Sequence, residues 1–114
     1  MNEYANGSLA HFDICGPDES VLHAFYGGVL GWEIESKGPG YALVTPPAGE
    51  TSGSITEGDT PGVVLGVVVE DLAATLERVL ELGGEVTMEP VDNGWVTKAG
   101  VNDPAGNPLS LIQK

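Results

Sequence analysis

Apolar and polar residues alternate along residues 9–14, and the alternation stops at a glycine-proline pair, a pattern that predicts a β-strand. Successive side chains of a strand point to opposite faces, so Phe12 and Ile14 share one face, and His11 and Asp13 share the other. This strand is therefore expected to have an apolar side and a polar side.

A helical pattern follows the predicted strand. Asp18 stands where an N-cap is expected, and apolar residues then recur at the helical period until glycines end the segment. The expected apolar stripe consists of Val21, Leu22, Phe25, Tyr26, Val29 and Leu30. Three short strands are predicted next, at residues 32–35, 41–45 and 52–56, with glycine- and proline-rich turns between them.

The same order of elements returns in the second half of the chain. It consists of a strand at residues 63–69, an N-cap at Asp71, a helix with Leu72, Leu76, Val79 and Leu80 on its stripe, and strands at 85–88, 95–101 and 109–112. A shift of 53 positions superposes Ile14 on Val67 and Asp18 on Asp71. The pattern predicts an internal duplication of a βαβββ unit within one domain of 114 residues, with modules at about 9–57 and 62–113.

Charge and cysteine content exclude several classes of partner and site. Seventeen acids against four bases give a net charge of −13, which argues against binding to nucleic acid or to anionic membranes. The scattered acids favour a solvated surface, with attraction of a cationic ligand as the alternative. The single cysteine, Cys15, excludes an internal disulfide and a multi-cysteine zinc site. Without a long apolar run or a secretory signal pattern, we expect a cytoplasmic protein.

Three stretches of the sequence resemble the vicinal oxygen chelate superfamily, which includes glyoxalase I, extradiol dioxygenases and bleomycin-resistance proteins. They are AHFDICGPDESVLHAFYGGVLGWEI, VEDLAATLERVLELGGEV and DPAGNPLSL, and together they cover about residues 9–113. The resemblance implies an α+β fold in which two βαβββ modules form curled mixed sheets around a shared cavity, with the helices outside. The polar face of the first strand would then line the cavity.

The resemblance also implies four positions for metal ligands, on the first and last strand of each module. His11 matches the first of them, whereas Val64, Ser54 and Ser110 stand at the others. A divalent ion needs three or more nitrogen, sulfur or carboxylate ligands, and serine hydroxyls are poor substitutes. Asp13 beside His11 would add one carboxylate but leave the site open and weak. We therefore expect no cofactor and no catalytic metal, although a divalent metal is the alternative.

The pair of His11 and Asp13 carries the catalytic hypothesis, because a histidine near a carboxylate can act as a general base at neutral pH. In the competing interpretation, His11 caps a wet cavity and bonds to neighbouring backbone. The predicted substrate-binding residues are Tyr41, Ser54, Trp95 and Ser110. For the two aromatic residues among them, packing in the core is an equal alternative.

Two functions fit these observations. In the first, the protein is an enzyme that moves a proton of a small oxygenated substrate without a metal, as a lyase, isomerase or epimerase does. In the second, it binds and sequesters a drug or metabolite without catalysis, and the acidic composition would favour a cationic one. A scaffold with a vestigial cavity is a weaker third hypothesis. We expect a homodimer in each case, because an exposed sheet edge invites pairing between copies.

Overall fold

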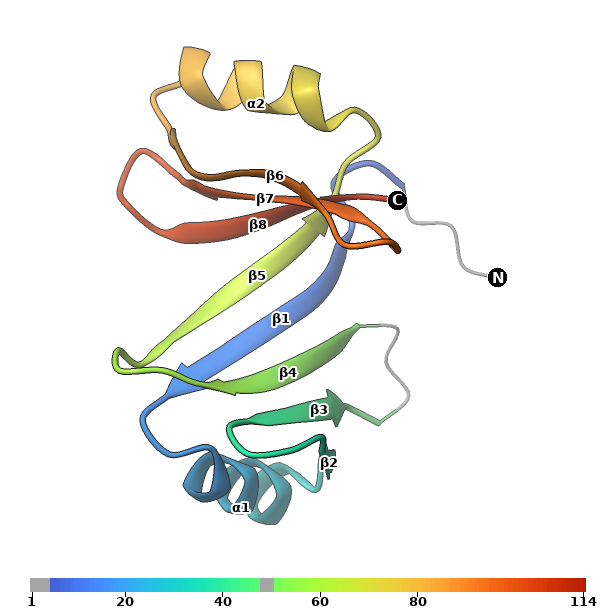
Figure 1. Cartoon of the computed structure of the whole chain (residues 1–114), viewed down its shortest axis with the longest axis vertical. Coiled ribbons are helices and arrows are strands. Elements are labelled where there is room, and N and C mark those ends of the chain that lie inside the picture. The colour runs from blue at the N-terminus through green and yellow to red at the C-terminus, as the bar shows by residue number, and fades with distance from the viewer. Residues whose placement is uncertain (1–4, 48–50) are drawn as a thin grey trace. The chain divides into compact units, whose positions relative to one another are not determined.

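The computed structural model describes residues 5–47 and 51–114, which form eight strands and two helices in the order βαβββ-βαβββ (Figure 1). The elements are β1 Leu9–Gly16, α1 Glu19–Leu30, β2 Glu33–Ser36, β3 Tyr41–Thr45, β4 Ser52–Glu57, β5 Gly62–Val68, α2 Leu72–Glu81, β6 Glu85–Asp92, β7 Thr97–Asn102 and β8 Pro108–Gln113. The predicted α+β class and the duplicated βαβββ order are confirmed.

The chain divides into two compact units, and each contains one helix and a mixed sheet. The first unit is His11–Val64, where the strand order is β2-β3-β4-β1. The second unit is Leu65–Lys114 together with the start of the chain through Ala10, and its order is β5-β8-β7-β6. In both units the first and last strands of the module, β1 with β4 and β5 with β8, are parallel, and the other pairs are antiparallel.

The core of the first unit lies on one face of its sheet. Ile14, Ala42, Val44 and Ile55 are buried there, and the residues packed against them are Phe12, Leu22, Tyr26, Trp32 and Ile34. The three largest rings are in contact, since Trp32 stacks on Tyr26 with centroids 5.6 Å apart and lies 5.5 Å from Phe12. Trp32 therefore fills the space between the sheet and α1.

The expected apolar stripe of α1 is only partly correct. Leu22 and Tyr26 pack against the sheet, whereas Val21, Phe25, Val29 and Leu30 are 49–62% exposed. Residues 21 and 25 each lie one position before a packed residue, and residue 29 follows 25 by about one turn, so at about 100° per residue all three lie on a neighbouring side of the helix. In α2, Leu72, Leu76 and Val79 pack against Ala99, Val101 and Leu111, but Leu80, one position after Val79, is exposed.

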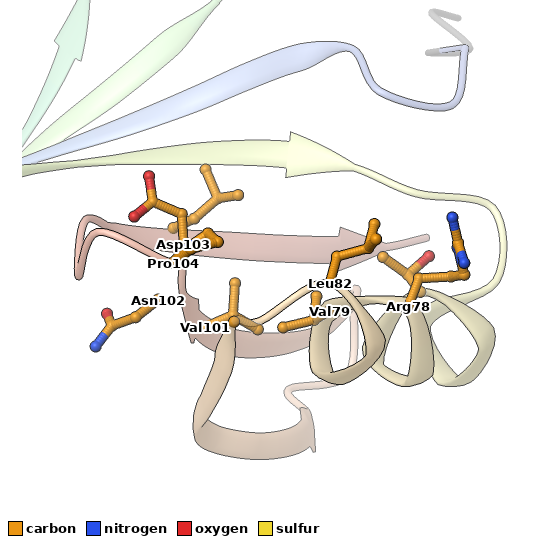
Figure 2. Close-up of a pocket in the computed structure, with 10 residues that line it drawn as sticks. Arg78, Val79, Leu82, Val101, Asn102, Asp103 and Pro104 are labelled. Carbon is orange, nitrogen blue, oxygen red and sulfur yellow. The ribbon is translucent and has the colours of Figure 1, made fainter.

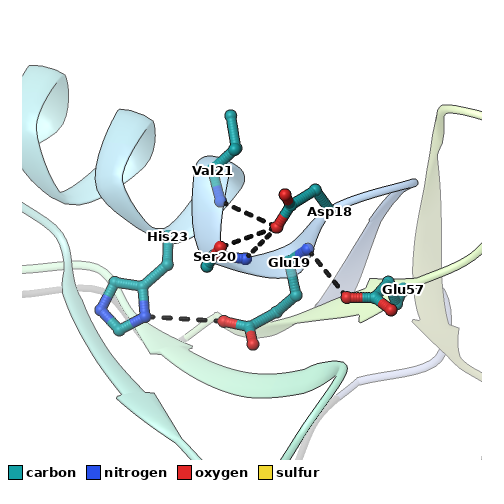
Figure 3. A network of polar contacts seen from close by, with 6 residues as sticks. All are labelled: Asp18, Glu19, Ser20, Val21, His23 and Glu57. Atoms are coloured by element: carbon teal, nitrogen blue, oxygen red, sulfur yellow. Dashed lines mark hydrogen bonds and ion pairs between the residues drawn. The ribbon is translucent and has the colours of Figure 1, made fainter.

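The N-terminus of α1 is held by carboxylates (Figure 3). Asp18 accepts hydrogen bonds from the amides of Ser20 and Val21 and from the Ser20 hydroxyl, and the bond from that hydroxyl is the main reason why the pKa of Asp18 is lowered. The buried Glu19 donates its amide to Glu57 and places its own carboxylate 3.6 Å from Nδ1 of His23. The predicted N-cap at Asp18 is confirmed, and so is the one at Asp71.

The predicted strand at residues 95–101 begins too early. Trp95 lies in the turn between β6 and β7 and is 89% exposed. The side chain of Asn93 accepts hydrogen bonds from the amides of Trp95 and Val96, and Gly94 has a φ of 96°, so the chain reverses here before β7 begins. The prediction that Trp95 belongs to a strand is therefore wrong.

The stretch Asp103–Asn107 forms the tight turn that its composition predicts. The Asp103 carboxylate accepts hydrogen bonds from the amides of Ala105 and Asn107 and from the side-chain amide of Asn107. The hydrogen bond from the Asn107 side chain is the main cause of the lowered pKa of Asp103. Gly106 adopts a φ of 97°, which glycine accommodates without strain. Within the described residues, neither helix is long and apolar enough to cross a membrane.

Candidate functional site

The polar face of the first sheet is created by the pairing of β1 with β4. The parallel register places Asp13 opposite Ser54 and His11 opposite Ser52, so these four side chains share one face. The intervening residues, Phe12 and its partner in β4, belong to the opposite face, where the core lies. A polar cluster thus lies directly behind the apolar core.

A single carboxylate oxygen joins three side chains of this face. Oδ1 of Asp13 lies 3.0 Å from Nε2 of His11 and accepts a hydrogen bond of 2.5 Å from the hydroxyl of Ser54. His11 and Asp13 are each a little over one-quarter exposed, whereas Ser54 is 2% exposed. The histidine therefore reaches solvent while the group that holds its partner is buried. Such an imidazole can exchange protons with a molecule bound on this face.

Tyr41 lies on the same face, one pair of residues further along the ladder. It is opposite Thr56 in β4, and Thr56 is opposite Cys15 in β1. Its ring is 41% exposed, so it is not a core residue, and its hydroxyl is free of hydrogen bonds to the described residues. The structure thus gathers four of the polar side chains noted in the sequence, His11, Asp13, Tyr41 and Ser54, on one sheet.

The other two predicted site residues belong to the second unit. Ser110 lies between Gly66 of β5 and Gly100 of β7, so neither neighbouring strand places a side chain beside its hydroxyl. That hydroxyl makes no hydrogen bond to the described part of the chain. Trp95 projects from the β6–β7 turn. Within their own unit, Ser110 and Trp95 are not brought into one cluster by any contact that the structure records.

The residues at the four positions implied for a metal do not fit a catalytic ion. Nε2 of His11 is directed at Asp13, and the Ser54 hydroxyl is donated to the same carboxylate. Val64 offers only a hydrocarbon, and Ser110 a neutral hydroxyl. Among residues 5–47 and 51–114, no three side chains of His, Cys, Asp or Glu come together in a group that could hold an ion. No chemical step is therefore assigned to a metal below.

A hollow of about 270 Å³ lies on the helix side of the second unit (Figure 2). Val79 and Leu82 come from the end of α2, and Val101 and Pro104 come from β7 and the turn after it. Its wall is mainly apolar, and Arg78 at its edge pairs with Glu81 at 2.7 Å. None of the predicted site residues lines this hollow, which lacks a histidine or a nucleophile and offers no obvious chemistry.

Residues on the polar face that the sequence did not single out are Ser52, Thr56 and Leu43. Alternation along β3 and β4 identifies which residues of each strand share a face. It does not identify which strand lies beside which, and only the register shows that these residues flank His11 and Asp13. The hydrogen bond between Ser54 and Asp13 was missed for the same reason.

Comparison with known proteins identifies the family. A model of the glyoxalase-like domain family matches residues 10–112. Anthracycline biosynthesis protein DauV of Streptomyces sp. (strain C5) is 30% identical over 114 residues, which cover 94% of this chain and 42% of that protein. The chain spans less than half the length of the curated relatives that it matches.

Solved structures agree on the fold. Methylmalonyl-CoA epimerase from Mycobacterium tuberculosis has a TM-score of 0.71 at 20% identity, over 99% of this chain and 92% of that one. The Mn(II)-bound glyoxalase from Novosphingobium aromaticivorans has a TM-score of 0.75 at 16% identity, over 95% of this chain and 39% of that one. At these identities the likeness concerns architecture alone. With the family match over nearly its whole length, the chain belongs to the glyoxalase-like family of the vicinal oxygen chelate superfamily.

Proposed function

We propose that this domain catalyses proton transfer at a carbon next to the carbonyl group of a small oxygenated metabolite, with His11 as the general base and without a metal. The observation that carries the proposal is the contact of 3.0 Å between His11 and Asp13, in a pair that is partly open to solvent. A histidine oriented by a carboxylate is a common general base at neutral pH.

The proposed reaction conserves atoms and electrons through a simple exchange. His11 takes the proton from carbon and becomes an imidazolium, while the electron pair of the C–H bond moves to the carbonyl oxygen. Return of the proton to the opposite face of the carbon gives an epimer, return to the same face regenerates the substrate, and return to a neighbouring atom gives an isomer. Tyr41, on the same face of the sheet, supplies a hydroxyl donor for the oxygen that gains charge.

Two further observations support this assignment. Ser54 uses its hydroxyl on Asp13, so we propose that it supports the base and that Tyr41 takes over substrate contact from it. An epimerase is among the proteins that share the fold, and epimerisation needs a base and no change of oxidation state. Reactions that activate oxygen require a metal centre, for which the described residues do not supply a ligand set.

The test is an exchange experiment that needs no knowledge of the natural substrate. The protein is incubated in D₂O with a panel of small 2-hydroxy and 2-methyl carbonyl compounds, and loss of the C–H signal is followed by proton NMR. We expect enzyme-dependent exchange with at least one compound, and His11→Ala to slow it by about 10²- to 10⁴-fold, the usual contribution of a general base.

His23 provides the matched control. It is the second of the two histidines in the chain, it lies in α1, and it pairs with Glu19 rather than with the polar face. His23→Ala should therefore exchange at the wild-type rate once circular dichroism has shown a normal fold. Addition of EDTA should leave the rate unchanged. Equal rates for His11→Ala and wild type, or loss of exchange in EDTA, would contradict the proposal.

Sequestration of a ligand remains the second candidate. It is favoured by the likeness to an anthracycline biosynthesis protein and by the net charge of −13, which attracts cationic guests. Calorimetric titration with a cationic anthracycline at two salt concentrations tests this function. Binding that weakens with salt and survives His11→Ala would favour sequestration over catalysis, and no heat at either concentration would remove it.

A further inference from the structure

The atom of His11 that faces Asp13 determines which ring nitrogen can act as a base. Nε2 is the nitrogen 3.0 Å from Oδ1 of Asp13, and the same oxygen accepts the hydroxyl proton of Ser54. An ionised carboxylate only accepts hydrogen bonds, so a neutral imidazole in this contact must carry its proton on Nε2. The lone pair then resides on Nδ1.

The contact with Asp13 leaves Nδ1 of His11 without a hydrogen-bond partner among the described residues. No hydrogen bond or ion pair joins the His11 side chain to the described part of the chain beyond the one to Asp13, and this side chain is 29% exposed. A general base must present an unprotonated nitrogen to the substrate. In the geometry observed here, that nitrogen is Nδ1.

Ser54 is a buried residue that holds the Asp13 carboxylate beside His11. The ladder between β1 and β4 places it opposite Asp13, it is 2% exposed, and its hydroxyl donates to Oδ1 at 2.5 Å. A buried hydroxyl donor fixes the carboxylate at the position from which it can accept the Nε2 proton. Rotation of Asp13 away from His11 would break its hydrogen bonds to His11 and Ser54 at once.

We infer that Ser54 is a positioning residue that acts through Asp13 to hold His11 as the Nε2–H tautomer, which makes Nδ1 the basic atom of the site. The chemical meaning of this inference rests on the proposed function, since it assigns the base atom of that reaction. The tautomer itself exists with or without a substrate, so it can be tested separately.

The experiment uses the full chain labelled with ¹⁵N and long-range ¹H–¹⁵N correlation NMR above about pH 8, where imidazoles are neutral. The two ring nitrogens of each tautomer have distinct shifts, and a histidine in a short unstructured peptide serves as the reference. We expect the Nε2–H form of His11 to exceed the other form by about tenfold or more, because hydrogen bonds to a charged acceptor are strong. A majority of Nδ1–H in the wild type would overturn the inference.

Variants separate a positioning role from a structural one. Ser54→Ala should bring the tautomer ratio of His11 several-fold closer to that of a histidine in a short unstructured peptide, and lower the exchange rate in D₂O by a similar factor. The matched control is Ser36→Ala, which removes a hydroxyl from β2 at the edge of the same sheet, opposite Ala42, and it should leave both quantities unchanged. An unchanged ratio in Ser54→Ala, or an equal change in Ser36→Ala, would refute the role of Ser54.

Asp13→Asn provides a second route if Ser54→Ala fails to fold, because the amide removes the charged acceptor while keeping the shape of the side chain. It should reduce the preference for the Nε2–H form to that of the reference peptide, and an unchanged preference would count against the inference. The two proposals fail in different ways. An Nδ1–H tautomer combined with loss of exchange in His11→Ala would remove this inference alone. An Nε2–H tautomer combined with full exchange in His11→Ala would remove the proposed function alone.

Discussion

At Gly53 in β4, the Phe12 ring occupies the space that the Cβ of any other residue would need. A Cβ built on Gly53 would lie 2.3 Å from two carbons of the Phe12 ring, whereas carbon atoms in ordinary contact are about 3.5–4.0 Å apart. In Gly53→Ala the ring must therefore move by more than about 1 Å. Trp32 restricts this movement, because its ring centroid lies 5.5 Å from that of Phe12 and its ring stacks on Tyr26.

The expected magnitude follows from two opposing effects. Overpacking of a core costs about 1–3 kcal/mol, while replacing glycine by alanine reduces the entropy of the unfolded chain and returns about 0.4–1 kcal/mol. We therefore expect Gly53→Ala to lower the free energy of unfolding by about 1–2 kcal/mol, measured by urea denaturation followed by circular dichroism. The control is Gly62→Ala, where an added Cβ has nothing within 4 Å and stability should change by less than about 0.5 kcal/mol.

A double-mutant cycle shows whether the Phe12 ring is the cause. Phe12→Leu removes the carbons that an alanine at position 53 would meet, so the double variant should be more stable than the sum of the two single effects predicts, by about 1 kcal/mol. Additive effects within about 0.5 kcal/mol, or a Gly53→Ala variant as stable as wild type, would show that the ring moves freely and that the reasoning from packing is wrong.

Two other sets of variants test local features of the fold. The pKa values of Asp18 and Asp103 are lowered in the folded state, so the stability that their ionised forms provide is present above the ordinary aspartate pKa of 3.8 and is lost as pH falls through the folded-state pKa. Asp18→Asn and Asp103→Asn should each lose less stability than wild type between pH 5 and pH 2 in stepwise urea titrations; curves parallel to wild type would contradict this. In α1, Gly28→Ala should raise the free energy of unfolding by about 0.5–1 kcal/mol, because glycine disfavours a helix interior and the added Cβ meets nothing. Gly31→Ala should lower it by about 1 kcal/mol, because the C-cap has a φ of 70°, and a thermal melt that ranks the two variants in the opposite order would count against this account.

The order of elements could be predicted because its signals are local. Alternation in β1 and the N-caps at Asp18 and Asp71 depend on a few neighbouring residues, and the structure contains all three. The turn around Asn93 and Gly94 also has a local sequence signal, since Asn-Gly is a strong turn signal between strands. The strand predicted from Trp95 onward begins two residues later, at Thr97, because the Asn93-Gly94 turn extends through Val96.

The buried side of α1 could not be read from its sequence with the same certainty. Apolar residues occupy two neighbouring sides of this helix, and Leu22 and Tyr26 are partly buried because the sheet lies on their side. Glu19, a charged residue, is buried at the N-terminus, with its carboxylate 3.6 Å from Nδ1 of His23. Tertiary packing determined which side faces the sheet, and periodicity alone did not contain that information.

Only the contact between neighbouring residues of one strand in the candidate site could be predicted from the sequence. His11 and Asp13 share a face because they are two residues apart on a strand, so their contact follows from alternation. Ser54 joins them across 41 positions of sequence, through the pairing of β1 with β4. That pairing arises from the whole unit, and no short stretch of sequence specifies it.

Core residues and polar residues alternate along β1, β3 and β4, and this arrangement affects how such a protein can diverge. Each strand of the first unit buries one set of positions against α1 and presents the other set on the opposite side. Replacements in the presented set can accumulate with little disturbance of the scaffold. A few mutations can therefore change the chemistry of one surface while the core beneath it stays the same.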